Sequence, residues 1–149
     1  MDSYREIENL VYTYAELIDT GNLEGMAQLF GHAEFLGPDG KVAATGAEEF
    51  LALQRQAVLI YSKTGTPLTK HVNTNLIIEV NEATDSATAR SYFTVLQSVE
   101  SLSLQPIIAG RYADSFERAE GKWRFRSRQV VPELYGDLSK HLLFDVSKK

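Results

Sequence analysis

The stretch TPLTKHVNTNLIIEV, residues 66–80, marks the point at which the chain changes from helical to strand periodicity. Gly65 and Pro67 interrupt the chain where this stretch begins. Before the break, apolar residues recur with the 3.6-residue period of a helix, and after it they alternate with a period of two. This order predicts an α+β fold in which helices come first and pack on one face of a sheet formed by the second half.

Helical spacing predicts three helices in the first half, each with its own start signal. The capping boxes SYRE and TGAE precede the first and the third, and an asparagine caps the second. A Thr-Gly pair ends the first helix, and the turn PDG separates two short extended pieces ahead of the third. The expected helices are residues 3–18, residues 23–30 and a segment from residue 45 to about residue 59.

Four long strands are predicted in the second half, joined by the connections NEATD, SLSLQP and AEG. Short connections between consecutive strands favour an antiparallel meander. With 149 residues, the chain is long enough to bury a core of its own, so we expect residues 1–149 to form a single domain. The expected strands are residues 72–80, 86–99, 107–117 and 122–131.

Composition and charge exclude several classes of function. The net charge is −5 and basic residues cluster only at 122–128, so we expect no nucleic-acid partner. No stretch is apolar enough to span a bilayer and no signal peptide is visible at the start of the chain, so we expect no membrane partner and a cytoplasmic location. The chain has no cysteine, three scattered histidines and no glycine-rich phosphate loop, so we expect neither a metal nor a cofactor.

A polar strip occurs where the second half begins. His71, Asn73 and Asn75 alternate along one face of the expected strand, while the opposite face carries apolar residues. A polar strip inside a small domain is expected where a pocket lies, although a histidine at the start of a strand is more often a satisfied polar residue. The residues predicted for the apolar face are Thr74, Leu76, Ile78 and Val80.

Asp19, at the last turn of the first helix, is the expected partner of His71. An acid ahead of a glycine is also ordinary turn chemistry, but the partial negative charge of a helix C-terminus disfavours a carboxylate and predicts a raised pKa. If the first helix crosses the concave side of the sheet, the two side chains meet. A buried aspartate bonded to one imidazole nitrogen orients the ring and fixes its tautomer, so the pair predicts a general base.

Other candidate side chains surround this pair. Tyr14 lies five residues before Asp19 and either borders the same cavity or belongs to the core. Strict alternation places Arg128 on a solvated face with Arg124 and Arg126, unless a β-bulge turns it inward. Three further tyrosines are predicted as cavity walls, since a phenol tolerates partial burial: Tyr92, Tyr112 and Tyr135.

The segments IENLVYTYAELIDTGNLEGMAQLF, KHVNTNLIIEV and AGRYADSFERAEGKWRFRSRQVV, followed by YGD, resemble the SnoaL-like branch of the nuclear transport factor 2-like superfamily. The resemblance extends over almost the whole chain. It implies a cone formed by a strongly curved, mostly antiparallel sheet and three helices, with a deep pocket inside. The scaffold hosts both enzymes and non-enzymatic binders, so the resemblance is more specific for the fold than for the chemistry.

Within this branch, Asp19 and His71 match the Asp–His dyad of cofactor-free lyases such as hexachlorocyclohexane dehydrochlorinase and bile acid 7α-dehydratase. Arg128 falls where the dehydrochlorinase carries a catalytic arginine. Tyr14 matches the dehydratase, whereas the dehydrochlorinase has lysine there. Scytalone dehydratase also uses Asp and His, but its second catalytic histidine has no counterpart here, since His32 and His141 stand in unrelated positions.

The resemblance implies a cofactor-independent lyase that carries out a dehydratase-type elimination on a small, apolar, cyclic substrate. Asp19, His71, Tyr14 and Arg128 are the expected catalytic residues, and Asn73 and the three cavity tyrosines are the expected substrate-binding residues. Two alternatives stay open: an isomerase or polyketide cyclase of the ketosteroid-isomerase type, and a binding protein without turnover. We also expect a homodimer or homotrimer built on the outer surface of the sheet.

Overall fold

The computed structural model describes residues 1–144, which form three helices and one six-stranded sheet. The spatial order of the strands is β2-β1-β6-β5-β4-β3, and all neighbours are antiparallel except β1 and β6. In chain order the elements are α1 (Ser3–Asp19), α2 (Leu23–Gln28), β1 (Glu34–Leu36), β2 (Val42–Thr45), α3 (Gly46–Ala57), β3 (Thr69–Asn81), β4 (Ser86–Val99), β5 (Leu102–Ala119) and β6 (Lys122–Tyr135).

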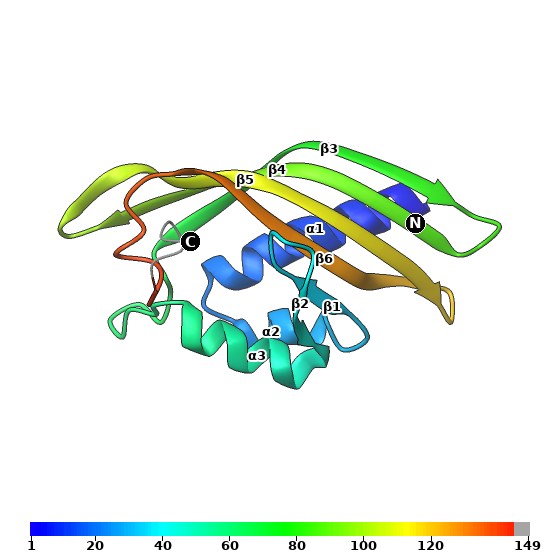
Figure 1. Ribbon diagram of the computed structural model, residues 1–149, viewed down its shortest axis with the longest axis horizontal. Coiled ribbons are helices and arrows are strands. Elements are labelled where there is room, and N and C mark those ends of the chain that lie inside the picture. The colour runs from blue at the N-terminus through cyan, green and yellow to red at the C-terminus, as the bar shows by residue number, and fades with distance from the viewer. Residues whose placement is uncertain (145–149) are drawn as a thin grey trace.

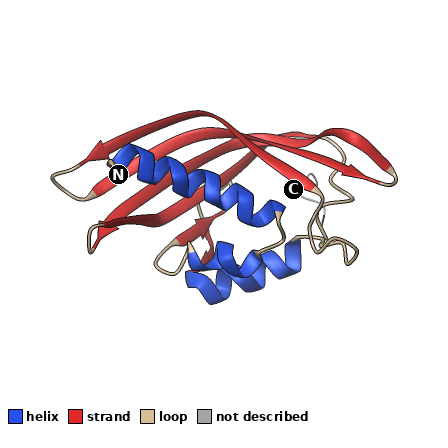
Figure 2. Ribbon diagram, turned by 180° about the vertical axis from the view of Figure 1, so that it is seen from behind, coloured by secondary structure: helices blue, strands red, loops and turns tan. Residues whose placement is uncertain are grey.

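The predicted α+β order is confirmed. The long strands β3 to β6 arch over α1, and α2 and α3 lie farther from the sheet on the same side (Figures 1 and 2). The connection SLSLQP was predicted as a turn, but most of it belongs to β5, which begins at Leu102. Pro106 is tolerated in that strand because it lies beside a β-bulge, where the register of β4 on β5 shifts between Val95 and Leu96.

Helix α1 is amphipathic and buries one side against the sheet, including Ile7, Val11 and Ile18. Its N-cap is Asp2, whose Oδ1 accepts a hydrogen bond from the Arg5 N–H at 2.9 Å, so the predicted capping box at Ser3 is wrong. The capping box predicted at Thr45 is also absent. Thr45 precedes α3 without a side-chain cap. None of the helices in residues 1–144 is long and apolar enough to cross a membrane.

The end of α1 is tied to the chain just ahead of β3. Gly21 has a φ of +77°, and a Cβ built on it would lie 1.9 Å from the carbonyl oxygen of Gly65. Only glycine permits this approach, because any side chain would collide with backbone. The contact brings the last turn of α1 beside the first residues of β3, and it therefore places Asp19 near His71.

A β-bulge in β3 overturns the predicted division of that strand into a polar and an apolar face. The register of β3 on β4 shifts between Thr74 and Ile77, and Asn75 has a φ of +54°. The extra residue reverses the alternation, so His71 and Asn73 before the bulge face the same side as Leu76 after it. Asn75 itself is exposed and leaves the polar strip.

A second bulge, in β6, decides the orientation of Arg128. Ser127 pairs with Ser115 and Phe125 pairs with Phe116, so Arg126 is the extra residue on β6. Arg128 therefore points to the same side as Phe125 and is fully buried. The prediction that Arg128 is solvated is therefore wrong, because the β-bulge that would turn it inward is present.

Candidate active site

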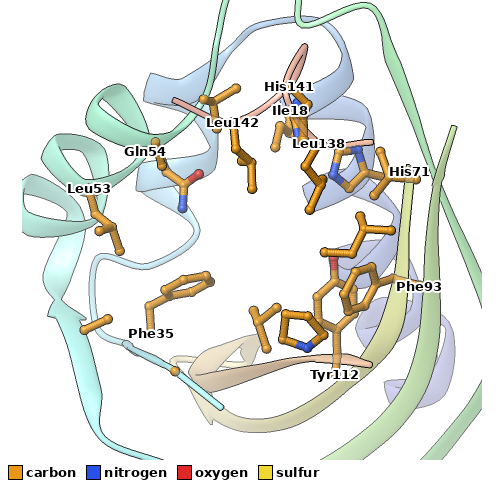
Figure 3. A pocket seen from close by; sticks show the side chains of 18 of the residues that line it. Ile18, Phe35, Leu53, Gln54, His71, Phe93, Tyr112, Leu138, His141 and Leu142 are labelled. Atoms are coloured by element: carbon orange, nitrogen blue, oxygen red, sulfur yellow. The ribbon is translucent and has the colours of Figure 1, made fainter. Parts of the chain in front are cut away.

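An apolar cavity of about 310 Å³ lies between the concave face of the sheet, α1, α3 and the segment 138–144. This volume is at the lower end of the range typical of small-molecule sites. Figure 3 shows His71, Phe93 and Tyr112 on one side of the cavity and Leu53 and Gln54 on the other. Further lining residues include Tyr14, Ile18, Phe35, Val58, Val95, Ile108, Val130, Leu138, His141 and Leu142.

Asp19 and His71 form a hydrogen-bonded pair at the wall of this cavity. The Nδ1 of His71 donates to Oδ1 of Asp19 at 2.6 Å, and the backbone N–H of His71 donates to Oδ2 at 2.8 Å. The hydroxyl of Thr69 donates to Oδ1 at 2.9 Å. Both side chains of the pair are more than nine-tenths buried. The carboxylate is held by three donors, so it fixes the orientation of the imidazole.

The pKa of Asp19 is lowered, whereas its place at a helix C-terminus had predicted a raised value. Burial alone would raise the pKa, but the hydrogen bonds and charge of His71 outweigh burial, and Thr69 adds to them. The local contacts dominate because they lie at hydrogen-bond distance. Asp19 is therefore a carboxylate at neutral pH, which is the form that accepts the Nδ1 proton of His71.

Tyr14 and Tyr112 border the same cavity, as predicted for both. Their rings pack edge to face, with centroids 6.1 Å apart. Burial raises the pKa of each phenol. Both tyrosines therefore keep their protons at neutral pH and are hydrogen-bond donors.

Arg128 lies beneath the two tyrosines and does not line the cavity. Its Nε and Nη2 donate to the two carboxylate oxygens of Asp114 at 2.8 and 2.9 Å. The guanidinium carbon lies 3.7 Å from the ring centre of Tyr112 and 4.3 Å from that of Tyr14. Burial would lower the pKa of Arg128, but Asp114 outweighs burial and raises it. Burial also raises the pKa of Asp114, yet the two short bonds favour the charged pair.

The other predicted binding residues fall outside the cavity or at its edge. Tyr92 is 54% exposed on the opposite face of the sheet, because alternation along β4 points Phe93 inward instead. Asn73 does not line the cavity but a separate cleft near Tyr12, which Asp19 and His71 also border. Tyr135 lines the cavity, although 47% of its surface is exposed. Of the three tyrosines, Tyr112 and Tyr135 therefore line the cavity and Tyr92 does not, and a role of the first two in substrate binding stays a prediction.

The outer face of the sheet exposes apolar side chains, including Val72, Ile77, Tyr92 and Leu134. Tyr92 and Leu134 line a shallow groove there together with Thr74. An exposed apolar patch of this kind is typical of a protein–protein contact. The homodimer or homotrimer expected on this face stays a prediction.

Three side chains near the cavity were missed from the sequence. His141 was assigned to an unrelated position, but its ring centre lies 5.9 Å from that of His71. Gln54 projects into the cavity from α3 (Figure 3). Asp114 is the partner of Arg128. The one usable signal was at Asp114, an acid at an inward position of an otherwise apolar strand, where a charge requires a buried partner.

The buried His141 predicts that the protein loses stability in mild acid. Burial and the neighbouring His71 lower the pKa of His141 to about 4, although Asp19 opposes them. Between pH 4 and 6.5 the unfolded chain then binds more protons at this residue, so the free energy of unfolding rises with pH, by up to about 3 kcal/mol. Urea unfolding at pH 4.5 and pH 7 measures this change.

The variant His141→Gln isolates the contribution of this residue. We expect a smaller loss of stability between pH 7 and pH 4.5 in this variant than in the wild type. Replacement of the exposed His32 by glutamine is the matched control and is expected to preserve the wild-type difference. Equal losses in the wild type and in His141→Gln would contradict the prediction.

Among residues 1–144, no group of three or more His, Cys, Asp or Glu side chains is arranged to hold a metal ion. The imidazole of His71 uses Nδ1 for Asp19, which leaves one nitrogen for a ligand in the cavity. The polar groups at the wall are therefore suited to proton transfer and hydrogen bonding.

A curved sheet over helices, with an apolar cavity and a buried Asp–His pair, places the chain among small α+β proteins with an interior apolar cavity. Residues 1–129 match the model of the SnoaL-like domain. The chain belongs to this family, within the nuclear transport factor 2-like superfamily. The resemblance found in the sequence is thereby confirmed.

Solved structures agree with this assignment. A variant of Rv3472 from Mycobacterium tuberculosis, a protein of unknown function, is 25% identical, with a TM-score of 0.69 over 87% of this chain and 71% of that one. A putative scytalone dehydratase from Novosphingobium aromaticivorans is 23% identical, with a TM-score of 0.69 over 90% and 86%. LinA is 23% identical, with a TM-score of 0.69 over 92% and 90%. No curated protein sequence gives a significant match.

Proposed function

We propose that this protein is a cofactor-independent lyase that removes water from a small, mostly apolar cyclic substrate. The observation that carries the proposal is the 2.6 Å hydrogen bond between His71 Nδ1 and Asp19 at the wall of an apolar cavity. Because Asp19 is ionised and accepts the Nδ1 proton, Nε2 of His71 is the nitrogen with a free lone pair. An oriented, buried imidazole in this tautomer is a general base.

In the proposed reaction, His71 takes a proton from a carbon next to a carbonyl group. The electrons of the C–H bond form the new double bond, and the C–O bond to the neighbouring hydroxyl breaks. Tyr14 donates its phenolic proton to the departing hydroxyl, which leaves as water, and the proton on His71 then returns to Tyr14. Burial keeps the Tyr14 phenol protonated until this step. The products are an enone and water.

Arg128 takes a different part in this proposal from the one implied by the family resemblance. Both carboxylate oxygens of Asp114 already bind its guanidinium, and the cavity wall does not include it. A direct contact with developing charge on the substrate is therefore not supported. We assign Arg128 as a positioning residue, since its guanidinium packs against the rings of both Tyr14 and Tyr112.

An isomerase of the ketosteroid-isomerase type is the second candidate, favoured by the two protonated phenols that border the cavity. Phenol donors stabilise an enolate, and an isomerase needs a base and such donors but no leaving group. The two reactions share the proton abstraction by His71. They differ in whether water is lost.

Two probe compounds separate these functions. We expect the protein to convert 4-hydroxy-2-tetralone to 2-naphthol faster than the uncatalysed reaction, followed by the fluorescence of the product. Exchange of the α-protons of 2-tetralone in D₂O, followed by NMR, reports proton abstraction alone. Exchange without dehydration would favour the isomerase. If the protein binds 2-naphthol but catalyses neither reaction, it is a binding protein and the proposal is overturned.

A further inference from the structure

The segment 138–143, which we call the C-terminal strap, is the red part of the ribbon in Figure 1. Its side chains Leu138, His141 and Leu142 form part of the cavity wall. Backbone hydrogen bonds attach it to the chain at the end of α3: Leu59 N–H donates to the His141 carbonyl, and Leu143 N–H donates to the Ala57 carbonyl, both at 2.8 Å. The side chain of Gln97 on β4 adds a bond of 2.9 Å to the Lys140 carbonyl. The strap is therefore held from α3 and from the sheet, which restricts the position of His141.

The ring of His141 is oriented toward the catalytic side of the cavity. It is only 4% exposed, lines the cavity, and lies edge-on to His71 with ring centres 5.9 Å apart. Its Nδ1 is buried without a hydrogen-bond partner among residues 1–144. A buried polar atom without a partner costs about 1–3 kcal/mol.

A ligand in the cavity would contact this ring, since His141 forms part of the wall. An imidazole both donates and accepts, so its natural partner is a hydroxyl or a carbonyl oxygen. A hydrocarbon or an alkyl halide leaves the ring without a partner. The side chain therefore discriminates among ligands of equal size by their oxygen substituents.

We propose that His141 is a specificity-determining residue that hydrogen-bonds an oxygen substituent of the ligand beside His71. The cavity then prefers ring compounds that carry a hydroxyl or carbonyl group over hydrocarbons and halides of the same shape. The inference rests on the ligand cavity of the proposed function, but it does not depend on the elimination itself. It places the oxygen-bearing end of the substrate between α1 and the strap.

Three ligands of similar shape test this inference: 2-naphthol, naphthalene and 2-chloronaphthalene, with affinities measured by titration calorimetry. We expect the wild type to prefer 2-naphthol about tenfold, the effect of one hydrogen bond of about 1.4 kcal/mol. In His141→Leu the preference for 2-naphthol should fall several-fold while naphthalene affinity is kept; any preference that remains comes from His71 and Tyr14, which line the same cavity. Glutamine has a donor and an acceptor, so His141→Gln should retain part of the preference for 2-naphthol. The control His32→Leu, at an exposed position, should leave the preference unchanged.

Nitrogen NMR of ¹⁵N-histidine protein gives a readout that a purely structural role would not move. The ring signals absent from His141→Gln identify His141, and we expect them to shift with 2-naphthol but not with naphthalene. An unchanged preference in His141→Leu, or unmoved ring signals, would overturn the inference. Failure of all three ligands to bind would overturn it together with the proposed function. If the protein binds the ligands with the expected preference but does not catalyse dehydration, the inference about His141 holds and only the proposed lyase activity is overturned.

Discussion

Replacement of His71 by alanine is expected to lower turnover of 4-hydroxy-2-tetralone by about 10²- to 10⁴-fold, the usual contribution of a general base. Asp19→Asn should have an effect of similar size, because an amide no longer favours the tautomer in which Nδ1 carries the proton. The double variant should be no slower than the slower single variant, since the two residues act as one unit. Steady-state kinetics of the three variants, corrected for the uncatalysed rate, measures this.

Two further variants serve as controls for this prediction. Tyr14→Phe removes a single donor, so its cost should be smaller than that of either dyad variant. Glu16→Gln changes an exposed carboxylate on the same helix as Asp19 and should leave the rate unchanged. Binding of 2-naphthol to each variant verifies that the cavity is intact. Multiplicative losses in the double variant would show that Asp19 and His71 do not act together.

Replacement of Arg128 by methionine is expected to lower the free energy of unfolding by about 3–5 kcal/mol, because it leaves the buried carboxylate of Asp114 unpaired. Asp114→Leu should cost a similar amount for the same reason. The double variant should be more stable than the sum of the two losses predicts, since no charge is then left alone in the core. Urea denaturation followed by circular dichroism measures these values.

The pair formed by Arg124 and Glu117 on the same two strands is the matched control. Nη2 of Arg124 lies 2.7 Å from Oε2 of Glu117, but about a third of each side chain is exposed. Arg124→Met should therefore cost no more than about 1 kcal/mol. If Arg128→Met retained wild-type stability and lost only activity, Arg128 would act directly on the substrate and its assignment as a positioning residue would be wrong.

The positions of the elements were predictable because their signals are local. Helical spacing predicted α1 to within one residue, and strand β4 was predicted with its observed ends, residues 86–99. The meeting of Asp19 and His71 was also predicted, because the two residues stand at the end of α1 and the start of β3 and the family resemblance supplied the crossing of helix and sheet. Helix α1 is regular to its end and β3 is regular from Thr69 to Thr74, so the faces that present Asp19 and His71 follow from the period.

Side-chain orientation beyond a bulge was not predictable from the period. A single extra residue reverses the alternation, and nothing in the run KWRFRSRQVV distinguishes Arg126 as that residue. The same applies at Asn75, where the reversal brings His71 and Leu76 to one face. Tertiary packing selects each bulge, because it allows Arg128 to reach Asp114 and the apolar end of β3 to cover the core.

The sequence by itself determined the order of helices and strands and the family, because these depend on local spacing and on motifs. It also predicted the Asp19–His71 pair, although 52 residues separate the two, because the family resemblance supplied the packing of the first helix on the sheet. Only the tertiary structure decided that Arg128 is buried against Asp114 and that His141 stands beside His71. These contacts join strands through bulges, or join residues that are far apart in the chain. Such contacts form because the folded backbone brings distant segments together and burial requires partners for their polar groups, and neither cause leaves a pattern in the local sequence.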